Sequence, residues 1–248
     1  MPTGTPDFGA QPSNVSPSFD GGEDTNHLLM GGGNISRSGR WFWATGFEGG
    51  GSADVATGGA APYGGPHVTN LVQSWQGNYS LLSKTNAVID DEQTFYKYFI
   101  SAQAPGKWGI ETMMGLGSLN SEVDFRLIKS SAAERMSAEL RFISGANIND
   151  VKLYYLDASN TYQLLADFGS TFALSVSVFH NVKFVVDFSE KKMVRVYVDG
   201  TVYEMNVPAY MPGGGVDSRD NFQIKHRTKI AGESTAVFDN VILTADEP

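Results

Sequence analysis

Two carboxylates in the segment SEVDFRLIK, residues 121 to 129, have a spacing that could support acid–base chemistry. Glu122 and Asp124 lie two residues apart, so a β-strand would place both side chains on one face. Two carboxyls about 5–5.5 Å apart can act as nucleophile and acid/base in glycoside cleavage. The next position on that face is Arg126, and a neighbouring guanidinium lowers a carboxyl pKa, the wrong direction for a general acid. We therefore expect charges on a partly exposed strand face and no catalytic residue.

Other residues with catalytic or metal-binding potential are few. The chain has no cysteine, which excludes disulfides, thiolate metal sites and cysteine catalysis. Its four histidines, at positions 27, 67, 180 and 226, are isolated, without metal-ligand spacing and without a G-x-S-x-G elbow. We expect His180 to be a packed or capping residue. The Gly-rich segment GGGSADVATGG lacks the lysine of a phosphate-binding loop.

Flat aromatic side chains could form a site of another kind, because they stack on the C–H faces of sugar rings. Our candidate glycan-binding residues are Tyr63, Trp75 and Trp108. The two tryptophans stand beside the turn-like segments QGN and PGK, so we expect them to be exposed. For each candidate, packing in the core is the competing interpretation.

The charge of the chain excludes some partners. The net charge is −9 over 248 residues, and KHRTK at 225–229 is the only dense basic run. We expect strand alternation to divide its charges between both faces, so nucleic-acid binding is not expected. No apolar run is long enough to span a bilayer. The N-terminal segment has neither the basic nor the apolar region of a signal peptide.

Short strands must position these residues. Segments with period-two alternation follow one another at intervals of roughly a dozen residues, which predicts an antiparallel sandwich or barrel. The clearest is FHNVKFVVDFSEKKMVRVYVDG at 179–200, a hairpin with SEKK as its turn and Asp-Gly as the next tight turn. SAAERMSAEL, at 131–140, is the best helical candidate. Residues 1–36, rich in Gly, Pro and Ser, predict an extended arm before one domain at 37–248.

The hairpin, extended to FHNVKFVVDFSEKKMVRVYVDGTVY, resembles the concanavalin A-like lectin/glucanase group, including its laminin G-like members. The closing AVFDNVILT and the early GFEGG and WQGNYSLL are similar to other strands of these domains. The resemblance implies an all-β, two-sheet antiparallel jelly-roll sandwich with one concave sheet. Glycosidases on this fold carry a third acid after the pair matched by Glu122 and Asp124, and Arg126 and Leu127 leave it missing here. The resemblance also implies a structural calcium ion at Glu48 and Asp239.

Fold alone does not determine function. We predict a non-enzymatic structural or interaction protein, located at a virion surface or outside the cell, such as a bacteriophage capsid decoration or tail component. Its arm would dock on protein partners in an oligomeric assembly. The alternative is a lectin-like carbohydrate-binding module that binds cell-surface polysaccharide. A glycoside hydrolase is the third hypothesis.

Overall fold

The computed structural model describes residues 40–47, 56–59, 65–70, 72, 74–75, 78–86, 88–99, 106–130, 134–147, 150–213, 220–229 and 231–248. The predicted arm at 1–36 lies outside the described residues, as do Tyr63 and Glu48. The side chains of Arg40, Trp41, Phe42, Ala56 and Phe99 are likewise not described. The division into arm and domain therefore stays a prediction.

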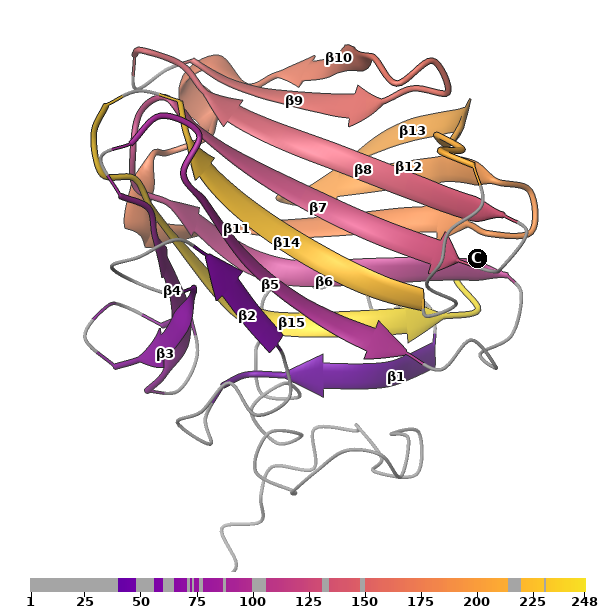
Figure 1. The fold of residues 1–248 in the computed structure, drawn as a ribbon, viewed down its shortest axis with the longest axis horizontal. Coiled ribbons are helices and arrows are strands. Elements are labelled where there is room, and N and C mark those ends of the chain that lie inside the picture. Colours follow the sequence, from indigo (N-terminus) through magenta and orange to yellow (C-terminus); the bar gives the residue numbers. More distant parts are fainter. Residues whose placement is uncertain are drawn as a thin grey trace, which may run out of the picture.

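The described chain forms two antiparallel sheets (Figure 1). Sheet A contains β1 (Arg40–Thr45), β3 (His67–Thr69), β4 (Ser80–Lys84), β6 (Lys107–Leu116), β11 (Ser175–Asp187), β12 (Lys192–Val198), β13 (Thr201–Pro208) and β15 (Thr235–Ala245). Sheet B contains β2 (Ala56–Gly59), β5 (Glu92–Phe99), β7 (Ser121–Ser130), β8 (Arg135–Ser144), β9 (Val151–Leu156), β10 (Tyr162–Asp167) and β14 (Asp220–Thr228). A 3-10 turn, η2 (Gly169–Thr171), is the one helical element among the described residues.

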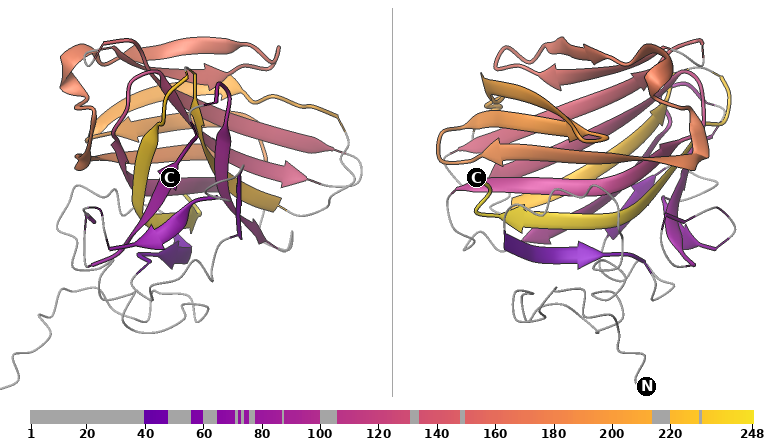
Figure 2. Two further views of the ribbon diagram at one scale, coloured as in Figure 1. Left: turned by 60° about the vertical axis from the view of Figure 1, so that its left-hand side comes forward. Right: turned by 180° about the vertical axis from the view of Figure 1, so that it is seen from behind.

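The strand order shows how distant segments become neighbours. Sheet A runs β13-β12-β11-β6-β15-β4-β3, with β1 also paired to β15, and sheet B runs β10-β9-β8-β7-β14-β5-β2. The last strands of the chain, β14 and β15, thus lie inside sheets B and A. Figure 2 shows the two layers from behind, with sheet A nearest the viewer. This arrangement confirms the predicted all-β sandwich.

Aromatic side chains join the two sheets across the core. Phe238 of β15 packs against Phe95 of β5 and Phe125 of β7, with ring centroids 5.3 and 6.5 Å apart. Trp43 of β1 packs against Phe222 of β14 at 5.4 Å. These rings come from alternate positions of their strands, so the intervening side chains are directed to the outer face of each sheet.

The hairpin of β11 and β12 forms as predicted. Val182 and its alternate neighbours face the core. The Asp187 carboxylate accepts hydrogen bonds from the backbone N–H groups of Ser189 and Glu190, both at 2.9 Å, which fixes the SEKK turn. Asp199 and Gly200 adopt φ values of 50° and 82°, as a two-residue hairpin turn requires.

Two local expectations were wrong. The predicted helix at 131–140 is largely β8, because Met136, Ala138 and Leu140 enter the core at a period of two, and packing overrides their helix propensity. Strand β6, in the middle of sheet A, has no counterpart among the predicted strands. Nine of its ten residues are buried, so it shows no alternation of polar and apolar side chains.

Candidate functional site

The outer face of sheet B carries an unusual density of charge. On β7, Val123, Phe125 and Leu127 enter the core, so Glu122 and Asp124 are directed outward together with Arg126. The alternation therefore confirms that the two acids share a face. It also brings them opposite the outward residues of both neighbouring strands.

The register supplies opposite charges on each side of β7. Arg126 lies opposite Glu139 of β8, and Asp124 lies opposite Arg141 of β8. On the other side, Glu122 lies opposite Arg227 of β14. We define the charged cluster as Glu92, Glu122, Asp124, Arg126, Glu139, Arg141, Lys225, Arg227 and Lys229, which are linked by ion pairs.

Asp124 is the most tightly held acid of the cluster. Its side chain is fully buried. Arg141 donates two hydrogen bonds to it, from Nε to Oδ1 at 2.6 Å and from Nη2 to Oδ2 at 3.0 Å, and Arg227 donates a further one to Oδ2. Bidentate, charge-assisted hydrogen bonds of this kind are among the strongest in proteins. Asp124 therefore acts as an anchor for the guanidinium groups around it.

Glu139 is a third buried carboxylate in the same cluster. It forms an ion pair with Arg126, and the Tyr162 hydroxyl of β10 donates a hydrogen bond to it. Burial and the nearby charge of Asp124 raise the pKa of Glu139 above its ordinary value, although Arg126 opposes the shift. Burial, with the charges of Asp124 and Glu139, also raises the pKa of Tyr162, so its hydroxyl keeps its proton. An acid with a raised pKa is suited to giving up a proton near neutral pH.

Glu122 is the least engaged of the three buried acids. Its Oε2 atom makes no hydrogen bond with the residues that the structure describes. It lies 3.5 Å from the Lys229 Nζ, 3.6 Å from Arg141 Nη1 and 3.8 Å from Arg227 Nε. The buried Oε2 atom of Glu122 is thus held by ion pairs and not by a hydrogen bond.

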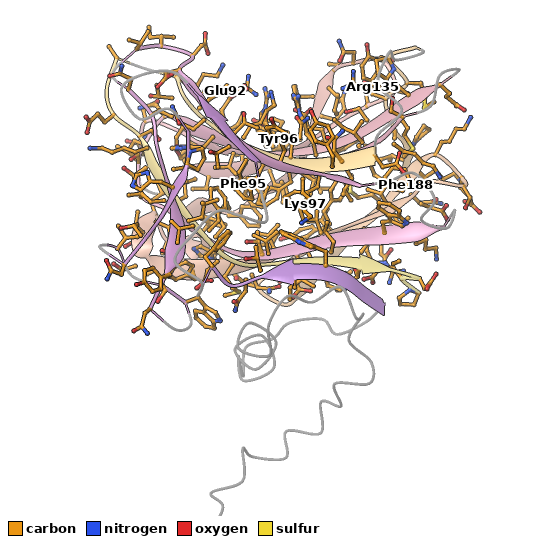
Figure 3. All side chains as sticks on the ribbon, turned by 60° about the horizontal axis from the view of Figure 1, so that its bottom comes forward. Glu92, Phe95, Tyr96, Lys97, Arg135 and Phe188 are labelled. Atoms are coloured by element: carbon orange, nitrogen blue, oxygen red, sulfur yellow. The ribbon has the colours of Figure 1, made fainter. Side chains whose placement is uncertain are left out.

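Tyrosines lie on both sides of the charged cluster. Tyr96 and Tyr98 of β5 share the outer face, with their rings in edge contact at 5.1 Å. On the other side, the Tyr162 ring lies under the Arg141 guanidinium at 3.8 Å, a cation–π distance. Figure 3 shows Glu92, Tyr96 and Arg135 on the outer side of sheet B, while Phe95 and Phe188 lie between the sheets. The outer face therefore combines a charged centre with aromatic flanks.

The glycan-binding candidates predicted from sequence lie elsewhere. Trp108 is 3% exposed and packs edge-on against Phe188 at 5.2 Å, so the expectation that it is exposed was wrong. Trp75 is 40% exposed, as expected, and its ring lies 6.2 Å from Phe179 of sheet A. Its backbone N–H donates to Asp239, an outward residue of sheet A. The structure therefore places Trp75 away from the charged cluster.

The remaining predicted sites are placed only in part. Both Asp239 side-chain oxygens accept hydrogen bonds, from the backbone N–H groups of Trp75 and Asn240. Among the described residues, no three His, Cys, Asp or Glu side chains form a group that could hold a metal ion. Calcium at Glu48 and Asp239 stays a prediction. His180 is packed: it stacks on Phe172 at 3.6 Å and contacts Asp199.

Two parts of the charged cluster were not predicted from the sequence. The charges of KHRTK do not divide between faces: Lys225, Arg227 and Lys229 are two apart and enter the cluster together, while His226 turns into the core. The alternation of residues within the run could have shown this. Likewise, Glu139 and Arg141 lie two apart and share the outer face of β8, but the sequence does not show that this face adjoins Glu122 and Asp124.

Comparison with known proteins shows similarity at the level of fold. No family model matches the chain, and no curated protein matches its sequence. A carbohydrate esterase of the Shiga toxin-encoding bacteriophage phi24B superposes with a TM-score of 0.54 and 14% identity over 78% of this chain and 90% of that one. A glycosidic hydrolase gives a TM-score of 0.51 and 13% identity, covering 83% and 97% of the two chains. The chain has the concanavalin A-like jelly-roll fold. A carbohydrate-binding module in complex with beta-1,4-galactotriose is similar more weakly, with a TM-score of 0.42 and 10% identity over 81% and 94% of the chains.

The prediction that this jelly roll is not an enzyme is wrong. It depended on a missing third acid, and Glu139 of β8 brings a third carboxylate into contact with the arginines that hold Glu122 and Asp124. Moreover, two solved structures that superpose with TM-scores above 0.5 are a carbohydrate esterase and a glycosidic hydrolase, so enzymes share this fold. Among the described residues, no helix has the length and apolarity needed to cross a membrane.

Proposed function

We propose that this protein binds a polysaccharide on the outer face of sheet B, across the charged cluster and its flanking tyrosines. The observation that carries the proposal is the combination of aromatic rings and a dense polar centre on one sheet face. The fold itself, shared with two enzymes that act on carbohydrates or glycosides, supports this without deciding it.

The chemistry of the face suits a sugar polymer. Tyrosine rings present flat apolar surfaces for pyranose C–H groups, and their hydroxyls can hydrogen-bond to the same ligand. The guanidinium groups of the cluster are already oriented by buried carboxylates, so little side-chain freedom is lost when they donate to a bound sugar. Tyr98, 38% exposed, is the aromatic residue best placed to contact the polymer first.

Two aromatic substitutions test the location. Tyr98→Ala on sheet B and Trp75→Ala on the sheet A side remove side chains of nearly equal exposure, 38% and 40%. Affinity electrophoresis through gels that contain polysaccharides should show Tyr98→Ala weakened by about tenfold, or about 1.4 kcal/mol. Trp75→Ala should migrate like wild type. The reverse result would place the site at Trp75, and no retardation of wild type by any polysaccharide would contradict the proposal.

A second candidate function is cleavage of the bound polymer. The raised pKa of Glu139 favours it, because acid–base cleavage needs a carboxyl that donates a proton, and Glu122 is a second buried acid on the same face. Release of reducing ends should disappear in Glu122→Gln and Glu139→Gln. Glu190→Gln serves as the control, because Glu190 is an exposed acid of the β11–β12 hairpin, outside the cluster. Equal turnover in all three variants would exclude these acids as catalytic residues.

We further propose that the protein is a surface component of a virion, such as a bacteriophage capsid decoration or tail protein. Similarity of fold to a bacteriophage protein supports it. Binding of cell-surface polysaccharide would give such a component a role at the host surface.

A further inference from the structure

The cations of the charged cluster lie above three of its four acids, and the fourth, Glu92, is 34% exposed at the edge of the cluster. The Asp124, Glu139 and Glu122 side chains are 0%, 2% and 6% exposed. The cationic side chains are exposed more: 12% for Arg141, 18% for Lys225 and Arg227, 24% for Arg126 and 37% for Lys229. A ligand that approaches this face therefore meets N–H donors first.

The local charge contrasts with that of the whole chain. The cluster contains five cations and four carboxylates, and Asp90, which pairs with Lys229 at its rim, brings the acids to five, whereas the chain carries a net charge of −9. Farther along β8, Arg135 faces outward, and its Nε atom is buried without a hydrogen bond to the described residues. At the rim, the exposed Asp90 pairs with Lys229 at 2.8 Å. The face therefore carries cations and acids in nearly equal number on a protein that is acidic as a whole, and at its centre the cations are the more exposed.

We infer that the polysaccharide bound by this face is anionic and carries carboxylate or sulfate groups; this inference rests on the proposed function. Guanidinium and ammonium groups bind such anions through charge-assisted hydrogen bonds, and a planar guanidinium can engage a carboxylate with two donors. The buried acids hold the cations in place from below. Lys225 and Lys229 are the residues that determine the preference, because their partners Glu92 and Asp90 are themselves exposed and can exchange them for ligand anions.

The test compares matched polymers and matched variants. Polygalacturonate and alginate supply carboxylates, dextran sulfate supplies sulfates, and unmodified dextran and β-glucan are neutral. The Lys225→Gln/Lys229→Gln double variant removes two charges from the cluster. Lys191→Gln/Lys192→Gln, at the β11–β12 hairpin of sheet A, removes the same charge where the side chains are 50% and 36% exposed.

Affinity electrophoresis of the full chain should show retardation by at least one anionic polymer, decreasing as salt is added. The cluster variant should bind at least about tenfold more weakly, and the hairpin variant should match wild type. Lys225→Arg should retain binding. Because the chain carries a net charge of −9, polyanions repel it non-specifically, so net charge alone cannot cause the retardation. Thermal unfolding of each variant checks that the fold is intact.

The outcomes separate this inference from the proposed function. Retention by neutral polymers alone, lost in Tyr98→Ala and unchanged in the double lysine variant, would overturn the anionic ligand and leave polysaccharide binding in place. Equal weakening by both lysine pairs would also overturn it, because the effect would then follow net charge. Retention by no polymer would contradict both. Binding to uronates or to dextran sulfate supports the inference and identifies the group recognised.

Discussion

Sheets A and B both bury charged side chains on their outer faces. In sheet A the cation is enclosed by protein, whereas in sheet B the cations face the solvent. In sheet A, the Lys183 side chain is fully buried, with its Nζ 2.8 Å from Glu247 Oε1 and 3.8 Å from Glu111 Oε2. Those acids are 1% and 2% exposed. In sheet B, Glu122, Asp124 and Glu139 are buried to a similar degree, but the cations above them reach solvent.

The difference separates a structural network from a binding face. Around Lys183, Asn181 Nδ2 donates to Glu111 at 3.2 Å and the Thr244 hydroxyl donates to Glu247, so the charges are satisfied within the protein. In the charged cluster, partly exposed cations retain donors that can reach a ligand. Burial of charge alone therefore does not identify a site, and the direction in which the cations face does.

Removing the enclosed cation should give the largest loss of stability. Lys183→Met keeps the length of the side chain but leaves two buried carboxylates without their cation, which should cost about 3–5 kcal/mol. Urea unfolding at neutral pH measures it. Lys192→Met, which breaks an exposed pair with Glu190, should change stability by less than about 1 kcal/mol. Equal small effects for both variants would show that the Lys183 network does not depend on its charge.

A second enclosed polar group, His226, should make the stability of the fold decrease as the pH is lowered. Its ring crosses the sandwich, 3.0 Å from the Ser83 hydroxyl of β4 and 2.8 Å from the Ser234 hydroxyl. Burial lowers the pKa of His226 to about 3. The unfolded chain therefore binds this proton more readily, so the contribution of His226 is complete above the ordinary pKa of 6.5 and is lost as pH falls toward 3.

The measurement compares how steeply the free energy of unfolding falls with decreasing pH in wild type and in His226→Asn. Wild type should lose about 1.4 kcal/mol per pH unit through this group below pH 6.5. His226→Asn should be less stable at neutral pH and should show a flatter decline by that amount. His67→Asn, at an exposed position, controls for the carboxylates that titrate over the same range. Parallel slopes for wild type and His226→Asn would contradict the enclosed, neutral state of the ring.

The sequence could predict the fold because its clearest signals are local. Alternation in residues 182–186 and the SEKK turn define one hairpin, and the Asp199–Gly200 turn defines the next, without reference to more distant strands. The shared face of Glu122 and Asp124 likewise follows from the two-residue alternation of a β-strand. Strand β6 was not predicted, because both of its faces are covered and its sequence does not alternate. For the same reason Trp108, which lies on β6, was wrongly expected to be exposed.

The candidate site was harder to predict because it depends on register between strands. Glu139 meets Arg126 only through the pairing of β7 with β8, and Arg227 meets Asp124 only through the pairing with β14, 103 positions away in sequence. Neither register is encoded locally. A missing third acid within one strand was therefore weak evidence against a site, since a neighbouring strand can supply it.

The smallest expected effect concerns the cluster itself. Lys225 pairs with Glu92 at 2.8 Å, and their side chains are 18% and 34% exposed. Burial raises the pKa of Glu92, but the hydrogen bond and charge of Lys225, together with Arg227, outweigh it and lower the pKa. Lys225→Gln leaves Arg227 beside Glu92 and should therefore cost less than about 1 kcal/mol in urea unfolding at neutral pH. A loss as large as that of Lys183→Met would mean that the cations of sheet B are structural like those of sheet A, and the distinction between the two faces would fail.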